Sequence, residues 1–367
     1  MRDTYRSAKQ SNRRKWRGFT IVELLIVVVI IAILAAITVV AYNGITANAN
    51  EAALKADLKT SASRLNTDSI TDGGGFPGIK PQFLGGHLGY AAGGDSFCVF
   101  GDVNSKVFHV NENGNISEGN CPARSMQTFT SKSCSYISTF TGINPESIVT
   151  LVDNRGGSVQ AYEIAKLTDG KCWMLTNLKL GSTSSDITLM PSDSDVSQAF
   201  TLPTVKYSGS SDYDAPAVYG PIGGSSLGYG YLYNWPAATA GASRLTNPAG
   251  SGNATSSICP ANWRLPTGGN DGDYSQLNTS FGGTNGYASL SPAADKWQNG
   301  GPFKGALSGN YYMGYGQQGA YGRLWSSSAS DSNLQFSHEH TFGANGVVSP
   351  AASVNRNLGI AVRCLVR

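Results

Sequence analysis

The sequence has few charged side chains and few of the groups that enzymes use. Only 14% of its 367 residues are charged, and four are histidines. It contains no H-E-x-x-H stretch, the pattern that binds a catalytic zinc on a helix. No two cysteines have the C-x-x-C spacing of zinc ribbons or thioredoxin-like sites. We therefore expect neither an enzyme nor a bound cofactor.

A basic surface for nucleic acid is also missing. The formal net charge is +3, but seven of the 27 Lys and Arg residues and only one of the 24 acids lie in Met1–Gly18. The rest of the chain therefore has 20 basic and 23 acidic residues, a net charge of −3. We expect no nucleic-acid partner. The basic N-terminus follows the positive-inside rule and predicts that everything after Ala41 lies outside the cytoplasm.

The most prominent stretch that is present is the apolar run within Arg13–Ala41. Leu24–Ala41 is eighteen residues long, carries no charge and has Thr38 as its only polar side chain. A helix over Phe19–Ala41 would be roughly 35 Å long, enough to cross a bilayer core of about 30 Å. Glu23 interrupts the start of the run, and a carboxylate inside a spanning helix costs about 2.5–3.5 kcal/mol. The acid therefore requires a role.

Three ordinary structures share some of these features. A secretory signal peptide cleaved at Ala47-Asn48-Ala49 would have a shorter apolar core without an acid. A plain signal anchor fits the length and the basic flank, but it gives Glu23 no role. A buried core helix of a soluble protein fits poorly, because the run is apolar on all sides and terminal.

The apolar run is preceded by Gly18-Phe19-Thr20-Ile21-Val22-Glu23-Leu24. This motif resembles the class III signal of type IV pilins and pseudopilins, and the resemblance covers residues 13–66. It implies that a prepilin peptidase cleaves after Gly18 and methylates the new N-terminus at Phe19. It also implies that the helix contacts other pilin subunits and that Glu23 pairs with the terminal amine of a neighbour. Such a pair would turn a costly buried charge into a contact that fixes register.

The helix is predicted to continue beyond the membrane. Leu54, Leu58 and Leu65 recur at offsets of four and seven, and no proline occurs from Phe19 to Phe76. The pattern predicts one helix of about 45 residues that ends near 66–72. Alternating segments and a hairpin turn then predict a small antiparallel sheet on the leucine face, closed by a Cys98–Cys121 disulfide. The segments are Phe97–Val99, Lys106–Val110 and Asn115–Ser117, and the turn is Asn113-Gly114.

A second composition begins near Met126 and contains five short motifs. They are Asp169–Leu178, Leu232–Ala238, Ile258–Thr267, Leu324–Ser328 and Gly359–Cys364. The order and the amino-acid sequences of these motifs resemble the bacterial major paralogous (FISUMP-type) surface domain over residues 145–367. The resemblance implies a loop-rich, mostly β fold related to C-type lectins. The motifs also supply Trp173, Trp235, Trp263 and Trp325, around which we expect the core to form.

Local patterns refine this picture. Ile148–Asp153 and Val159–Leu167 flank Arg155-Gly156-Gly157 and predict a hairpin. After Trp263, the Thr267 region is expected to lead into a short helix with Tyr274 and Leu277 pointing inward.

The six cysteines all lie beyond the apolar run, where an oxidising compartment makes disulfides the default. Six cysteines allow 15 pairings, and the sequence alone does not choose among them. Beside Cys98–Cys121, we put forward Cys134–Cys172 and Cys259–Cys364 as hypotheses.

Two weak metal candidates lie in the same region. In a strand, His338 and His340 would share one face and form half of a metal site. Asn270, Asp271 and Asp273 offer three oxygen ligands to calcium. The Glu-Pro-Asn, Gln-Pro-Asp and Trp-Asn-Asp triplets of calcium-dependent lectins are absent. A solvated strand and a polar loop would show the same patterns.

Tyrosines in two Gly-Tyr-rich runs are candidates for a binding face. Equally, they could cover the core or lie in loops. The runs are Gly228–Tyr233 and Tyr311–Tyr321.

These features predict an α+β protein in which a long N-terminal helix packs on a small antiparallel sheet and a loop-rich, mostly β domain follows. The expected parts are a prepilin leader (1–18), the N-terminal helix (19–70, with 19–41 spanning the membrane), a small pilin head (71–125) and an exterior domain (126–367).

The predicted function is that of a type IV pilin-like filament subunit, of the minor or adhesive kind. Its expected partners are prepilin peptidase, other pilin subunits, the inner membrane before assembly, and a surface glycan or protein. The chain is expected to cross the cytoplasmic membrane once and to reach a pilus or the cell surface after assembly. Two alternatives remain: a pseudopilin of a type II-like secretion system, and a membrane-anchored surface receptor or enzyme.

Overall fold

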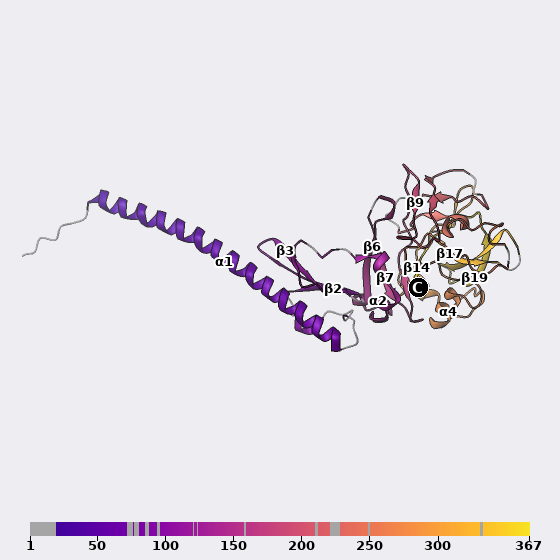
Figure 1. Ribbon diagram of the computed structural model, residues 1–367, viewed down its shortest axis with the longest axis horizontal. Helices are drawn as coiled ribbons and strands as arrows, with labels where there is room; N and C mark the ends of the chain where they lie inside the picture. The colour runs from indigo at the N-terminus through magenta and orange to yellow at the C-terminus, as the bar shows by residue number, and fades with distance from the viewer. Residues whose placement is uncertain are drawn as a thin grey trace, which may run out of the picture.

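The computed structural model describes residues 20–71, 76, 81–84, 88–93, 96–119, 121–122, 124–157, 159–209, 212–220, 228–248, 250–330 and 333–367. These residues form a long helix, a small sheet beside the second half of that helix, and a larger, mostly β part (Figure 1). The α+β arrangement predicted from the sequence is confirmed.

Helix α1 runs without a break over Ile21–Thr71, and its 51 residues span roughly 75 Å. It ends within the predicted range and is a few residues longer than the 45 or so expected, and Gly44 does not interrupt it. Within the described residues it is the one helix long and apolar enough to cross a membrane. Its apolar half is not covered by any of the described residues: Ile21 is 79% exposed and Val27, in the middle of the run, 47%.

The second half of α1 packs on a four-stranded antiparallel sheet. Leu54, Leu58 and Leu65 are buried against Phe97 and Phe108 of that sheet. The sheet has the order β1-β2-β3-β4, and the Asn113-Gly114 turn joins its last two strands. The leucine face, the sheet and the turn are therefore confirmed. The strands are β1 (Gly89–Gly93), β2 (Ser96–Val103), β3 (Lys106–Asn111) and β4 (Ile116–Glu118).

The larger part is built on a six-stranded sheet of order β14-β20-β8-β7-β6-β5. Only the β5–β6 pair is parallel. The predicted hairpin at Arg155–Gly157 joins β6 to β7. The strands are β5 (Arg124–Ser125), β6 (Ile148–Asp153), β7 (Gln160–Lys166), β8 (Cys172–Met174), β14 (Trp263–Arg264) and β20 (Leu365–Val366).

Smaller sheets and short helices surround this one. A three-stranded antiparallel sheet consists of β17 (Tyr321–Ala329), β18 (Phe336–Gly343) and β19 (Val348–Asn355). Shorter strands are β9 (Ile187–Leu189), β10 (Phe200–Leu202), β11 (Val205–Lys206), β12 (Val218–Tyr219), β13 (Leu232–Tyr233), β15 (Asn310–Tyr311) and β16 (Tyr315–Gly316). The helices are α2 (Ser131–Ser135), α3 (Trp235–Ala238), α4 (Asp273–Ser280) and α5 (Ala294–Trp297).

Tryptophans form the centre of the larger part. The four expected from the motifs are completely buried, as are Tyr274 and Leu277 of α4. A fifth, Trp297, is buried too, although no motif pointed to it. Their indole N–H groups find acceptors, as burial requires: that of Trp235 donates to the Ser326 carbonyl and that of Trp325 to the Tyr233 carbonyl.

The structure contains three disulfides: Cys98–Cys121, Cys134–Cys172 and Cys259–Cys364. These are the three pairs put forward from the sequence. The first closes the small sheet. The second ties α2 to β8, and the third holds the chain before β14 to the C-terminal segment that ends in β20.

Loop-closure entropy predicts unequal contributions from the two disulfides of the larger part. The paired cysteines are 105 residues apart in Cys259–Cys364 and 38 apart in Cys134–Cys172. Replacing the first pair by alanines should lower the free energy of unfolding by about 1 kcal/mol more than replacing the second pair.

Tryptophan fluorescence during denaturant unfolding measures this difference, because five of the six tryptophans lie in this part of the chain. Equal losses, or a larger loss for Cys134–Cys172, would contradict the entropic explanation.

Candidate functional site

Glu23 lies in the first turn of α1 and caps that helix. Its Oε2 accepts hydrogen bonds from the Thr20 backbone N–H (2.9 Å) and the Thr20 hydroxyl (2.7 Å). The Thr20 Oγ1 in turn accepts from the Glu23 backbone N–H (3.2 Å). This reciprocal pattern is a capping box, which satisfies N–H groups that have no partner within the helix. Gly18 and Phe19, the predicted cleavage and methylation residues, lie outside the described residues.

Asp273, one of the three residues considered for calcium, is a buried ion-pair partner. Its Oδ1 accepts from Lys171 Nζ (2.8 Å) and its Oδ2 from Arg264 Nη1 (2.6 Å). The Thr267 backbone N–H and hydroxyl also donate to Oδ2. Burial alone would raise the pKa of Asp273, but the hydrogen bonds and charges of these partners hold it well below its usual range.

Two cations therefore already neutralise this carboxylate. Asn270 and Asp271 are exposed, and no group of three His, Cys, Asp or Glu side chains suited to a metal occurs among the described residues. The carboxylate of Asp273 is thus already engaged by Arg264 and Lys171, and the calcium site stays a prediction that added calcium can test.

The two histidines do not form half of a metal site. Both lie in β18, but His340 is completely buried, with its ring 3.9 Å from Trp297 and 5.0 Å from Tyr274 between centroids. Burial lowers the pKa of His340 to about 3, so its imidazole is neutral and belongs to the aromatic core.

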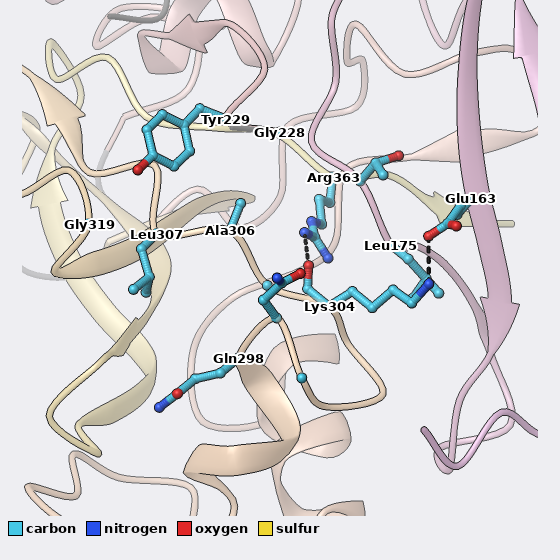
Figure 2. A pocket seen from close by; sticks show the side chains of 14 residues that line it. Glu163, Leu175, Gly228, Tyr229, Gln298, Lys304, Ala306, Leu307, Gly319 and Arg363 are labelled. Atoms are coloured by element: carbon cyan, nitrogen blue, oxygen red, sulfur yellow. Dashed lines mark hydrogen bonds and ion pairs between the residues drawn. The ribbon is translucent and has the colours of Figure 1, made fainter. Parts of the chain in front are cut away.

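A cavity of about 660 Å³ lies between distant parts of the chain. Figure 2 shows Tyr229 and Leu307 on one side of it, Glu163 on the other, and Arg363 between them. Its walls come from β7, the segment after β8, residues 228–229, the segment after α5 and the segment before β20. The lining residues are Glu163, Leu175, Thr176, Gly228, Tyr229, Gln298, Asn299, Gly300, Lys304, Gly305, Ala306, Leu307, Gly319 and Arg363.

Buried aromatic rings fix the loop after α5, which forms one wall. Trp297 and Phe303 flank the loop, are completely buried and lie 4.7 Å apart between ring centroids. The Gly305 N–H donates to the Trp297 carbonyl. A Cβ at Gly305 would stand 2.1 Å from that carbonyl oxygen, so only glycine fits there. Lys304 has a φ of +52°, an unusual value for a residue with a Cβ.

Arg363 is a completely buried cation at this cavity. Its Nε donates to Asn177 Oδ1 (2.8 Å), and its Nη1 and Nη2 donate to the carbonyl oxygens of Phe303 (2.6 Å) and Lys304 (2.9 Å). All three acceptors are neutral. Burial lowers the pKa of Arg363 to about 9, so the guanidinium still carries its charge at neutral pH. Among the described residues no carboxylate forms an ion pair with it.

The other charges of the cavity cancel each other. Lys304 Nζ lies 2.9 Å from Glu163 Oε2, and both side chains are partly exposed (Figure 2). With Arg363, the lining carries two cations and one anion, a net charge of +1. Thr176 adds a buried hydroxyl without a hydrogen-bond partner in the described structure.

The Gly-Tyr runs contribute one tyrosine and two glycines, Gly228 and Gly319, to this site. Tyr229 lines the cavity, whereas Tyr233 and Tyr311 are buried in the core. The hydroxyl of Tyr233 donates to the Leu180 carbonyl. Tyr233 and Tyr311 therefore cover the core, one of the alternatives left open from the sequence, whereas Tyr312 is exposed and a binding role for it stays a prediction.

Sequence reasoning did not identify Glu163, Lys304 or Arg363 as site residues. Arg363 stood in a quoted motif directly before Cys364, but its neighbours in space are about 60 and 186 residues away along the chain. The signal in the sequence that could have identified Arg363 was its position as a charged residue within an otherwise apolar segment.

Two known protein families match parts of this chain. The model described as the Fibrobacter succinogenes major domain matches residues 168–366, more than half of the chain. The chain belongs to the Fibrobacter succinogenes major domain family. A second model, the prokaryotic N-terminal methylation motif, matches residues 13–39. No curated protein and no solved structure gave a significant match.

The two matches agree with the fusion predicted from the sequence: a type IV pilin-like N-terminus followed by a FISUMP-type domain. The Fibrobacter succinogenes major domain match starts after β7, although β5, β6 and β7 belong to the same sheet as β8. The domain limits and the relationship to C-type lectins stay predictions.

The role of Asp273 is testable with a neighbouring control. Asp273→Asn should lower the free energy of unfolding by about 3 kcal/mol, because Arg264 and Lys171 lose their shared anion. Asp271→Asn changes an exposed side chain and should cost less than about 0.5 kcal/mol. Added calcium should leave the unfolding midpoint of the wild type unchanged. A midpoint that calcium raises in the wild type but not in Asp273→Asn would restore the calcium site.

Proposed function

We propose that this protein is a minor, adhesive subunit of a type IV pilus that displays its larger C-terminal part as a binding domain at the cell surface. Prepilin peptidase would cleave after Gly18 and methylate Phe19. The chain would await assembly in the inner membrane with its C-terminal part outside. It would act by assembly and contact, without catalysis.

The exposed apolar half of α1 carries this proposal. Large apolar side chains cover every side of the helix from Ile21 to Ile45, and those whose burial is described are all exposed. An apolar surface of this size needs a lipid or protein environment. The methylation motif at residues 13–39 supports the sequence of events in which lipid covers this surface first and other pilin subunits cover it after assembly.

The position of the binding domain supports the display role. In Figure 1 the apolar end of α1 extends away from the larger part, with the small sheet between them. Subunits that pack side by side through α1 would therefore leave the cavity-bearing part free to face outward.

The capping box supports a second role for Glu23. Both of its hydrogen bonds to Thr20 use Oε2, which holds the carboxylate at the start of the helix. In the proposed filament, Oε1 receives the terminal amine of a neighbouring subunit. That ion pair offsets the cost of a carboxylate in an apolar surrounding.

The proposal is tested by shearing filaments from the cell surface and probing them for this protein. Recovery of the chain in purified filaments, with residues 126–367 accessible to added antibody, is the expected result. A chain that stays in the membrane fraction of cells that make filaments would instead favour the pseudopilin or the anchored receptor.

Two substitutions of Glu23 separate capping from charge pairing. Glutamine keeps the capping box but removes the charge, whereas alanine removes both. We expect Glu23→Ala and Glu23→Gln each to reduce the amount of the chain in sheared filaments at least tenfold, with membrane levels unchanged. Normal assembly of Glu23→Gln would show that only the helix cap matters and would exclude the ion pair.

A further inference from the structure

The cavity of Figure 2 has a charge that the chain itself does not balance. Five other arginines of the larger part pair with a carboxylate. Among the described residues, Arg356 and Arg363 are buried and donate to neutral oxygens instead, and of these two only Arg363 lines the cavity. A buried charge is costly unless an opposite charge and good hydrogen bonds compensate it. The three neutral acceptors of Arg363 supply the hydrogen bonds, but the opposite charge is missing.

Lys304 supplies a second cation to the cavity, beside Arg363. The carbonyl of Lys304 accepts from Arg363, while its ammonium reaches Glu163 at the partly exposed edge. A ligand carboxylate that approached Lys304 would compete with Glu163 for a cation that is already in place. The uncommon backbone conformation of Lys304 fits this double use, because residues held in such conformations cluster at functional sites.

The rest of the lining suits a sugar better than a peptide side chain. The volume of about 660 Å³ falls within the range of about 300–1,000 Å³ for small-molecule sites. Polar side chains and glycine backbone make up most of the lining residues. Tyr229 supplies one aromatic ring, and Thr176 offers a hydroxyl without a hydrogen-bond partner in the described structure. The aliphatic lining is small: Leu175, Ala306 and Leu307.

We propose that this cavity binds the carboxylate of an acidic sugar, with Lys304 and Arg363 supplying the positive charge and Gln298, Asn299 and Tyr229 contacting the ring and its hydroxyls. The inference rests on the proposed display function, since it names the class of ligand that the exterior domain would contact. Uronic acids and sialic acids share this carboxylate, and both are included in the test.

The test measures binding by titration calorimetry on the full chain purified in detergent. The probes are trigalacturonic acid and sialyllactose, each compared with its methyl ester, which removes the charge and keeps the sugar. We expect at least one acid to bind, its ester to bind at least tenfold more weakly, and added salt to weaken binding of the acid.

Substitutions on either side of the ion pair give opposite predictions. Lys304→Gln removes a cation and should weaken binding of the acid about tenfold, whereas Glu163→Gln frees that cation and should strengthen it about threefold. Lys296→Gln breaks a similar ion pair with Asp295 outside the cavity and should leave affinity unchanged. Arg363 is left intact, because its hydrogen bonds also hold the loop.

Three results would overturn the inference: no binding of either acid, equal binding of acid and ester, or shifts of the same sign for Lys304→Gln and Glu163→Gln. Tighter binding of a peptide with a free C-terminal carboxylate than of both sugars would assign the site to peptides. Because the assay uses unassembled chain, its outcome is independent of whether the protein enters filaments.

Discussion

The organisation of this protein depends on an apolar helix surface that the chain itself cannot bury. Hydrophobic stabilisation requires that such a surface be removed from water, and the first half of α1 has no partner within the described structure. Lipid and neighbouring subunits are the two environments that serve this purpose. The second half of the same helix already has a partner, since Leu54, Leu58 and Leu65 bury against the small sheet. The same helix thus carries the surface for assembly in its first half and packs on the folded small sheet with its second half.

The larger part of the protein is stabilised in a different way from α1. With few aliphatic runs, its core relies on five tryptophans, two disulfides and buried ion pairs such as Asp273 with Arg264 and Lys171. Hydrogen bonds and ion pairs from buried side chains hold long loops in place without regular secondary structure, as Arg155 does for Ile258 and Cys259. Arg356 and Arg363 depart from the ion-pair pattern, because both donate to neutral oxygens, and Arg363 is the one of the two that lines a described cavity. For that reason the cavity beside it is the strongest site in this part of the chain.

How much the sequence could predict follows from the range of the interactions involved. Helix α1, the leucine face, the Asn113-Gly114 turn and the β6–β7 hairpin depend on neighbours within a few residues, and these were predicted. The buried tryptophans followed from their size. The Lys171–Asp273 ion pair and the contacts of Arg363 join residues about 60 to 186 positions apart, and no local pattern encodes them. The same holds for His340, whose alternation with His338 suggested a metal site although its ring stacks in the core.

We propose that the apolar half of α1 first acts as a targeting signal and then remains in the mature protein as the assembly surface. The most direct measurement is the mass of the N-terminal peptide of the protein isolated from cells. The account predicts a peptide that begins with N-methylated Phe19 and retains the apolar helix. A chain that begins at Met1, or one cut after Ala49 without the helix, would contradict it.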